Sequence, residues 1–485
     1  MSYQGLALTS NRVLGFLIFG AIVAITLLLG LWAGKKVKTS DDFFVGGRKF
    51  GKLISTCTQC ATWIGGAMTV AWISFGYENG GAAYWYTATQ SIGCFVTAFF
   101  LIKFFRAKKY TSLPEYFHDI YKNNLLYILF ILVTLITPVT WIASQLTASA
   151  RVMQGVLGID FTVGVIISAF VVLAYSVFGG YMSVAYTDCF QFIMLAALFL
   201  IVAPQPLSQA GGVSAVINAF EPEFSSPIHF TTISHLCILV WMIYGVTEFL
   251  SNQTIYQRIY SSDSAKTARF SILFTGILTV FWGLLTPTVG MAIRTMNADL
   301  VPDTAFSWFL ANRGSSFLSM ALLAVVMMAT MSTADSCVNS ISVNISYDIY
   351  KGVIDKNADD KTVLRAGRIA SLALGLISVY WALQGGSIVR FFSFTAGLSA
   401  GPLTGAVIYT ALLPKYRSTK GMLAGLIVGV VSGAVAMKIP ALDAIVGGGV
   451  LLSCPLTIIV ACIVGAMTKD ETTGRKPDEI TTEAI

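Results

Sequence analysis

Apolar stretches of about 20 residues or more recur along the whole chain, and they limit its fold more than any other feature. Such a run, read as a helix, crosses the hydrocarbon core of a bilayer, where helices satisfy their own backbone hydrogen bonds. The runs are continuous rather than alternating, which excludes barrel strands. We therefore predict an all-α polytopic membrane protein with about 13 transmembrane helices, placed in the cell (plasma) membrane. The predicted spans are 13–33, 51–77, 81–105, 124–156, 161–179, 183–204, 233–253, 269–293, 315–349, 366–385, 388–413, 421–438 and 444–467.

Composition supports this class. Charged residues make up 11% of the chain and hydrophobic residues 55%, whereas soluble proteins carry about 25% charged residues. The net charge of +7 does not indicate a nucleic-acid partner, because basic residues of membrane proteins gather in cytoplasmic loops. We expect membrane lipids as neighbours, no nucleic acid and no obligate protein partner.

Lysine and arginine fall in alternate loops. With the N-terminus outside and the C-terminus inside, 25 of the 31 basic residues lie in the cytoplasm. Loop 34–52 holds six of them, and loop 254–269 holds three, Arg258 among them. Loop 205–232 holds none, which disfavours two halves of six spans joined by a charged middle loop. The tail 468–485 is predicted to be cytoplasmic.

The ninth span is unusually rich in oxygen. Ala329, Ser332, Thr333 and Ser336 stand at i, i+3, i+4 and i+7, so a helix places them on one face, beside a second polar stripe that contains Asp335. Small hydroxyls and free carbonyls are ligands for a hard cation such as sodium. A carboxylate inside the membrane needs a partner. We predict a cation site on this helix.

The second span carries Gly65-Gly66 in mid-membrane. Paired glycines there either unwind the helix and free carbonyls for a ligand, or let two helices pack closely. Beside the oxygen-rich ninth span, we favour the discontinuous helix. Trp63 precedes the glycines, and Trp141 follows Pro138 in the fourth span. Both indoles are either packing bulk or the walls of a pocket for an organic cation.

Two acids lie in spans. Asp188 stands near the cytoplasmic end of the sixth span, and Glu248 lies deeper in the seventh. Asp188 either snorkels to water or has a role inside the span, and Glu248 pairs with a hydroxyl, a proton or a cation. The chain shows no converging nucleophile, base and acid, so we do not expect an enzyme.

Five motifs together resemble the sodium:solute symporter family, over nearly the whole chain. They are TSDDFFVGGR, TSLPEYFHDIY (Thr111–Tyr121), SVFGGYMSVAYTDCFQ (Ser176–Gln191), NQTIYQRIYSS (Asn252–Ser262) and MSTADS. Within this family, ATWIGG, GGYMSVAYTD and STADS are most similar to the high-affinity choline transporter branch.

The resemblance implies a fold and a domain plan. One transporter domain, 1–485, would contain two inverted repeats of five helices, 51–204 and 233–413, with discontinuous helices at spans 2 and 7. Helix 13–33 and the two helices in 421–467 would be peripheral.

The resemblance also implies sodium as the coupling ion and names its ligands. The carbonyls of Ala61 and Ile64 would face the carbonyl of Ala329 and the hydroxyls of Ser332 and Thr333.

A second sodium would lie further inward. Asp188, Asp335 and Ser336 would hold it.

For the substrate, the resemblance implies sodium-driven uptake of choline through an aromatic pocket. Trp63 and Trp141 match the branch, but Asn252 replaces an expected aromatic residue and Glu248 an expected small one. We predict that these four residues bind a small organic solute: choline, another quaternary ammonium or a zwitterion. An amino acid, a sugar or a carboxylate are the open alternatives within symport. An ion channel or a membrane sensor that reuses a transporter fold are the alternatives from other classes.

Overall fold

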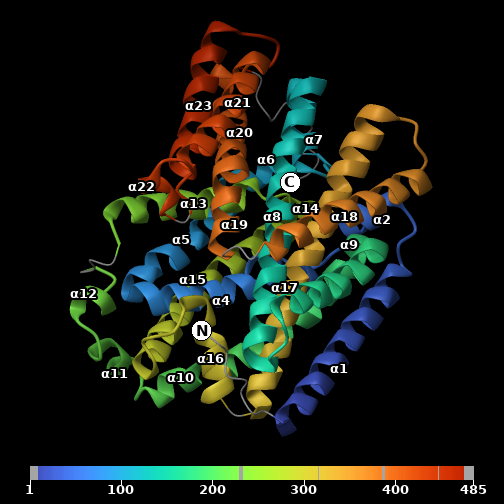
Figure 1. Ribbon diagram of the computed structural model, residues 1–485. Helices are drawn as coiled ribbons and strands as arrows, with labels where there is room; N and C mark the ends of the chain where they lie inside the picture. The colour runs from blue at the N-terminus through green and yellow to red at the C-terminus, as the bar shows by residue number, and fades with distance from the viewer. Residues whose placement is uncertain are drawn as a thin grey trace.

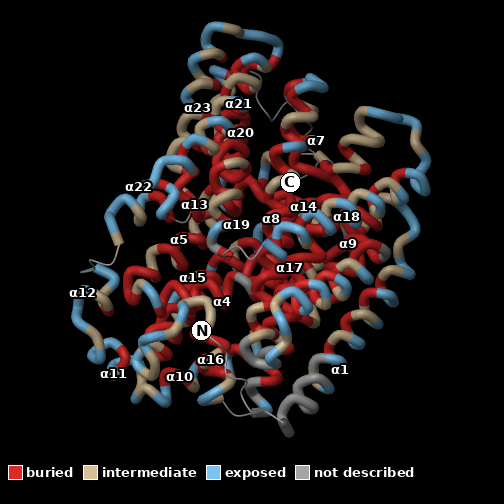
Figure 2. Tube along the Cα trace, viewed as in Figure 1, coloured by how far each residue is buried: buried red, intermediate tan, exposed pale blue. Residues whose placement is uncertain are grey.

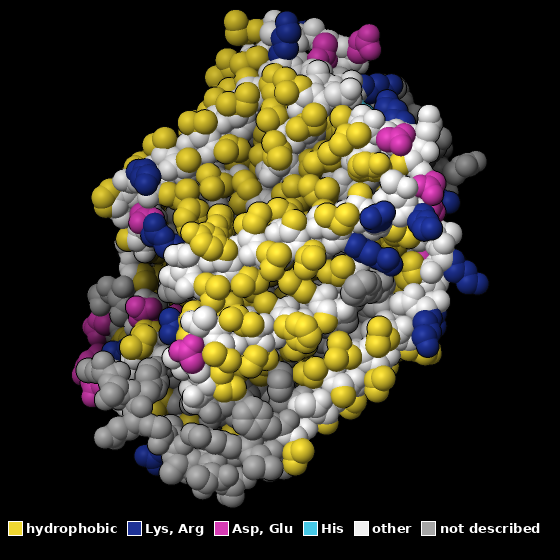
Figure 3. Space-filling view, turned by 45° about the vertical axis from the view of Figure 1, so that its right-hand side comes forward, with side chains coloured by type: hydrophobic (Ala, Val, Ile, Leu, Met, Phe, Trp, Pro, Cys, Tyr) yellow, Lys and Arg dark blue, Asp and Glu magenta, His cyan; other side chains and the backbone are white. Residues whose placement is uncertain are grey.

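The computed structural model describes residues 9–106, 108–228, 233–314, 316–384, 388–445 and 447–474. Within these ranges the regular structure is helical, apart from one isolated bridge between Phe50 and Ser262. Eight described helices are long and apolar enough to cross a membrane, or nine if one bent pair counts as a span. Hydrophobic side chains cover a broad field of the visible surface, as expected for a protein that faces lipid (Figure 3).

The helices that correspond to the predicted spans match them within a few residues at most ends. In the first half they are α1 (Thr9–Gly34), α3 (Lys52–Trp63), α4 (Gly66–Asn79), α5 (Ala83–Val96), α6 (Ile102–Phe105), α8 (Asn124–Leu157) and α9 (Phe161–Val202). In the second half they are α13 (His235–Ser251), α14 (Gln253–Ser261), α15 (Ala265–Met296), α17 (Ser316–Ser342), α18 (Asp360–Leu383), α19 (Ile388–Thr395), α20 (Gly401–Leu412), α21 (Thr419–Ala436) and α23 (Val450–Met467). Wider π-helical turns occupy Thr97–Leu101, Val343–Ile354 and Ala396–Ala400.

Short helices lie in the connections. They are α2 (Ser40–Val45), α7 (Leu113–Tyr121), α10 (Pro204–Gln209), α11 (Val213–Asn218), α12 (Pro222–Ser225), α16 (Ala305–Asn312) and α22 (Pro440–Asp443), with single 3₁₀ turns at Gly46–Arg48, Gly80–Ala82, Pro302–Thr304 and Pro414–Tyr416.

The predicted fifth and sixth spans are joined almost without a loop. Helix α9 covers both, and its helical path breaks at Gly180, where φ is 58° and ψ is −167°. A Cβ atom at Gly180 would collide with the ring of Phe43, and the positive φ disfavours any other residue. The sharp change of direction therefore requires glycine.

The second span is discontinuous, as predicted. Helix α3 ends at Trp63, Ile64 and Gly65 leave helical geometry, and α4 begins at Gly66. A Cβ at Gly65 would collide with the Thr333 hydroxyl, and one at Gly66 with the backbone of α17. Both readings of the glycine pair are thus correct, because the unwound segment also packs closely against α17.

The seventh span is also broken, but its second half differs from the sequence prediction. Helices α13 and α14 meet at Asn252 with a bend of 50°. We expected residues 254–269 to form a cytoplasmic loop, whereas Gln253–Ser261 is a helix whose residues are all buried, including Arg258. The prediction failed because the polar sequence QTIYQRIYS reads as a loop unless its buried partners are known.

The helices form two packed groups around the broken segments. Helix α17 packs on α8, α9 and α1, whereas α15 packs on α3, α4 and α5. Helices α21 and α23 pack on each other and on α20, at the edge of the molecule (Figure 1). The central elements α8, α14 and α17 are largely buried (Figure 2). The discontinuity between α3 and α4 therefore lies where the two groups meet.

Candidate ion and solute site

The predicted cation ligands of α3 and α17 lie together. The Ser332 hydroxyl lies 3.1 Å from the carbonyl oxygen of Ala61 and 3.0 Å from that of Ala329. The Thr333 hydroxyl lies 3.3 Å from the Thr62 carbonyl and 3.4 Å from the Ala329 carbonyl. All five residues are buried. Oxygens bound to one hard cation at about 2.4 Å are roughly 3.4 Å apart along an octahedral edge, so these spacings suit a single ion.

One oxygen of this cluster lies outside the predicted ligand set, and the Ile64 carbonyl stays a prediction. The structure brings the Thr62 carbonyl to Thr333, and Thr62 was not predicted. Ile64 lies at the break itself, where its N–H donates to the Cys60 carbonyl over 2.8 Å. Because the ligands from α3 are backbone oxygens, no side-chain pattern distinguishes Thr62 from Ile64 in the sequence.

Asp188 lies in a second, charged cluster between α3, α9, α14 and α17. Its Oδ2 accepts from Arg258 Nη2 at 3.0 Å, and both side chains are fully buried. The Thr58 hydroxyl also donates to this oxygen. The same Arg258 nitrogen donates to Ser336 Oγ at 2.6 Å and to the hydroxyl of Thr62. A buried ion pair needs such additional hydrogen bonds to offset its desolvation.

Two of the three residues predicted for a second sodium, Asp188 and Ser336, thus contact a guanidinium group. Asp335 is buried beside them, and its Oδ1 lies 3.5 Å from Ser336 Oγ. The second sodium site stays a prediction. Arg258 was missed, although a signal existed: Asp188 needed a cation, and the QR motif supplied one.

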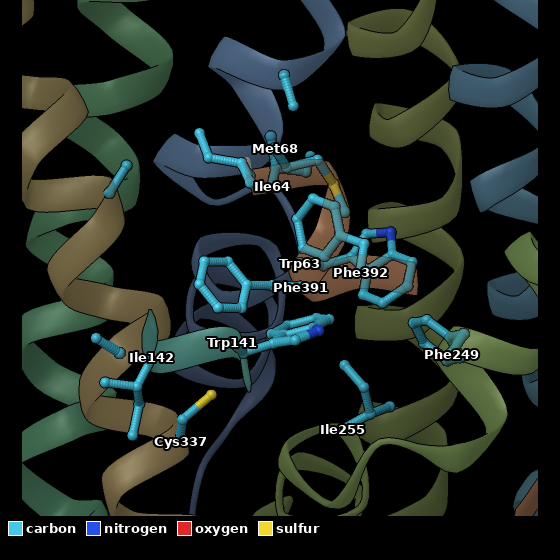
Figure 4. Close-up of a cluster of buried hydrophobic side chains, with 14 of the residues drawn as sticks. Trp63, Ile64, Met68, Trp141, Ile142, Phe249, Ile255, Cys337, Phe391 and Phe392 are labelled. Carbon is cyan, nitrogen blue, oxygen red and sulfur yellow. The ribbon is translucent and has the colours of Figure 1, made fainter. Parts of the chain in front are cut away.

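The two predicted tryptophans face one another in an aromatic cluster (Figure 4). The ring centroids of Trp63 and Trp141 are 6.4 Å apart, and Phe249 lies 4.8 Å from Trp63. A cavity of about 10 Å³, roughly the space of one water, opens beside them. It is lined by Thr62, Trp63, Gly65, Met68, Trp141, Gln145, Thr333 and Phe392. The oxygen cluster and the aromatic cavity therefore share Thr62 and Thr333.

Glu248 does not line this cavity but lies beside Trp141, which does. It is 1% exposed, and its Oε1 has no hydrogen-bond partner among the described residues. The Trp141 indole and the Tyr244 hydroxyl interact with its carboxyl group. None of the ion pairs found in the described ranges includes Glu248. A buried carboxyl group without a counter-charge is either protonated or able to bind a cation.

Asn252 has a structural task at the bend between α13 and α14. Its Oδ1 accepts from the backbone N–H of Thr254 at 3.0 Å and from the Thr254 hydroxyl at 2.8 Å, which caps α14. Its Nδ2 has no acceptor in the described part of the chain. The side chain therefore fixes the bend through its oxygen and keeps its donors for another group.

Comparison with solved structures defines the fold class. A Na⁺-coupled sialic acid symporter superimposes on this chain with a TM-score of 0.83 and 19% sequence identity. The match covers 94% of this chain and 98% of the symporter. Mhp1, a nucleobase-cation-symport-1 family transporter, superimposes with a TM-score of 0.60 at 15% identity. The chain therefore shares its fold with these two proteins.

The sequence comparison is more specific. The model of the sodium:solute symporter family matches residues 43–429, and the chain belongs to this family. The osmoregulated proline transporter OpuE of Bacillus subtilis is 24% identical and covers 83% of this chain and 84% of its own length. The high affinity choline transporter 1 of Homo sapiens is 25% identical, and the match covers 84% of this chain and 74% of that transporter. The predicted sodium-coupled symporter of the plasma membrane fits these findings, but proline and choline transporters are equally similar to the chain.

Proposed function

We propose that the protein imports a small organic cation or zwitterion together with sodium, and that Ala61, Thr62, Ala329, Ser332 and Thr333 bind the sodium. The observation that carries this proposal is the sharing of Thr62 and Thr333 between the oxygen cluster and the aromatic cavity. An ion that draws α3 and α17 together orders one wall of the solute cavity, so the two ligands favour each other's binding.

The driving force follows from charge movement. Each sodium ion that moves inward across the membrane gains about 2.3 kcal/mol per 100 mV. In the topology that we propose, with 13 spans and the N-terminus outside, α3–α4, α5, α13–α14 and α15 would rock against the remaining helices. The closed cavity beside Trp63 has space for about one water, so a solute enters only when these two groups separate.

The four residues that we propose for the solute favour a positively charged group on it. Trp63 and Trp141 offer ring faces, Glu248 offers a carboxyl group, and the Asn252 amide offers a donor for a carboxylate or hydroxyl. Choline, another quaternary ammonium and a zwitterion such as proline fit this pattern. A solute with only a carboxylate fits poorly beside Glu248. An uncharged sugar gains nothing from the charge of the Glu248 carboxylate.

A second sodium remains part of the proposal. It would bind Asp188, Asp335 and Ser336, and it would have to displace the guanidinium group of Arg258 from Asp188 and Ser336.

Uptake into proteoliposomes tests the function. Labelled proline and labelled choline are offered separately, with an inward sodium gradient and with an equal potassium gradient. We expect accumulation of one of them in sodium alone, and its loss in the double variant Ser332→Ala, Thr333→Ala. Ser340→Ala is the matched control, because this buried hydroxyl on α17 has no hydrogen-bond partner among the described residues. Equal uptake in both gradients, or full uptake by the double variant, would contradict the mechanism.

A further inference from the structure

A second and much larger cavity opens between the end of α4, the start of α13, the turn Pro302–Thr304 and the α22 region. Its volume is about 630 Å³, enough for a small organic solute. In the proposed topology these segments lie at the outer ends of their spans. We call this cavity the outer vestibule, and define it by Phe75, Glu78, Cys237, Trp241 and Asp303.

The outer vestibule is acidic. Glu78 and Asp303 are the two charged residues that line it in the described ranges, and neither forms an ion pair there. Glu78 is exposed and Asp303 is half-buried. Two carboxylates of a concave surface raise the local concentration of cations.

Two arginines lie near these acids, and the contacts of each guanidinium group are with residues outside the cavity lining. Arg294, close to Glu78, donates to the Tyr77 carbonyl at 2.9 Å and stacks 4.8 Å from the Phe224 ring. Arg151, close to Asp303, lies over the Phe161 ring at 4.6 Å.

Neither guanidinium lines the outer vestibule. The carboxyl groups of Glu78 and Asp303 are therefore the charged groups that a ligand inside the outer vestibule would contact.

The inner wall of the vestibule is aromatic and carries a donor without a partner. Trp241 lies 5.8 Å from Phe75 and 5.4 Å from Tyr86, centroid to centroid. Trp241 is only 3% exposed, and its Nε1 has no acceptor in the described part of the chain. Ring faces attract a cation, and an unpaired N–H needs an acceptor. A ligand with both groups satisfies the site.

The aromatic wall continues inward to the central site. Tyr86 stacks on Tyr244 at 6.3 Å, and Tyr244 interacts with Glu248, which in turn interacts with Trp141. A continuous series of side-chain contacts thus connects the outer vestibule to Glu248 and Trp141.

We propose that the outer vestibule is a second binding site, which holds a small organic cation bearing a hydrogen-bond acceptor before the cation reaches Glu248. Glu78 and Asp303 attract the cation, Phe75 and Trp241 contact it, and the Trp241 indole donates to its hydroxyl or carboxylate. The passage inward rests on the proposed function, whereas binding in the outer vestibule does not.

Cys237 provides a reporter inside the vestibule, because its half-buried thiol lines the cavity. The full-length protein is reacted at pH 8, without sodium, with a cationic and an anionic methanethiosulfonate of equal size. Cys237→Ser gives the background from the other cysteines. We expect the cationic reagent to react about tenfold faster at Cys237. Glu78→Gln with Asp303→Asn should remove this preference, and Asp299→Asn, an exposed acid outside the cavity, should keep it. Equal rates for the two reagents in the parent protein would overturn the acidic vestibule.

Protection of Cys237 tests the ligand. Choline, proline and tetramethylammonium are each added before the cationic reagent. We expect choline or proline to protect Cys237 from the reagent. The variant Trp241→Phe should weaken this protection severalfold, because it removes the indole donor. It should not change protection by tetramethylammonium, which lacks a hydrogen-bond acceptor. Protection must persist in Ser332→Ala, Thr333→Ala, which removes central ion ligands. Protection lost in that variant, or absent for all three compounds, would overturn the second site. Absent uptake with intact protection would instead contradict only the proposed function.

Discussion

Two polar clusters lie between α3 and α17, and they satisfy their oxygens in opposite ways. The cluster around Ser332 contains only carbonyls and hydroxyls, 3.0–3.4 Å apart, and no charge. The cluster around Asp188 contains a carboxylate that already has a cation, Arg258. An ion at the neutral set would replace hydrogen bonds between uncharged groups, whereas an ion at the charged set would compete with a guanidinium cation. We therefore expect sodium to favour the neutral cluster, and the charged cluster to act as a structural lock.

The largest expected effect comes from breaking the ion pair. Arg258→Met leaves the Asp188 carboxylate buried without a counter-charge, and we expect a loss of about 3–5 kcal/mol in the free energy of unfolding. Thermal unfolding in detergent measures this change. Asp188→Asn combined with Arg258→Met should recover much of the loss, because no uncompensated charge remains. If Arg258→Met were as stable as the parent protein, the pair would not be a lock.

A smaller effect should separate the two clusters. Sodium raises the melting temperature of a protein whose native state binds it, and a tenfold weaker site loses about 1.4 kcal/mol of that stabilisation at saturating ion. We expect Ser332→Ala to lose the part of the sodium-dependent rise that the neutral cluster supplies, and Ser336→Ala to lower the melting temperature while keeping that part. Melting curves in sodium and in potassium chloride decide this. The opposite pattern would place the ion with Asp188.

The helix cap at Asn252 offers a finer test. Asn252→Ala removes the acceptor for Thr254 and should cost about 1 kcal/mol, whereas Asn252→Asp keeps the acceptor and should cost less. Since α14 carries Arg258, this loss should affect the charged cluster and leave the sodium-dependent rise in melting temperature intact. A changed sodium response in Asn252→Ala would show that the two clusters are coupled through the bend.

The smallest expected effect concerns an acid outside the membrane, Glu115 of α7, which has no arginine or lysine in ion-pair contact among the described residues. Burial raises the pKa of its carboxyl above the ordinary value of 4.5, although the Thr111 N–H donates to it at 2.6 Å. A raised pKa in the folded state stabilises the protein at low pH, and this contribution is lost as pH rises from 4.5 through the folded-state pKa.

Glu115→Gln should remove that part of the pH dependence and change stability by less than about 1 kcal/mol. Melting temperatures between pH 4.5 and 8 measure it. We expect the melting temperature of the parent protein to fall more between pH 4.5 and pH 8 than that of Glu115→Gln. Equal falls in the two proteins would contradict the prediction.

The features that could be predicted from the sequence are those that depend on the spacing of neighbouring residues. The apolar runs located the helices, and the period of Ser332 and Thr333 placed both hydroxyls on one face, because helical geometry alone determines it. The glycine pair at Gly65 located the break in the second span. These features need no knowledge of distant residues.

Features built from distant segments escaped prediction. Arg258 and Asp188 lie 70 residues apart in sequence, so the topological reading placed Arg258 in a loop. The outer vestibule combines Glu78, Trp241 and Asp303 from three separate elements, and nothing in the pattern of any one element indicates the other two. The Thr62 carbonyl is backbone and leaves no trace in residue type.

The short bridge beside Phe50 has a consequence for motion. The Phe50 N–H donates to the Ser261 carbonyl at 3.2 Å, and the Asp263 N–H donates to the Phe50 carbonyl at 3.0 Å. These bonds tie the residues just before α3 to the residues just after α14. They thereby staple the α3 half of one broken helix to the α14 half of the other, at the ends that lie away from the two breaks. A shift of α3 carries α14 with it, and the staple makes one moving piece out of two segments that are about 200 residues apart in the chain.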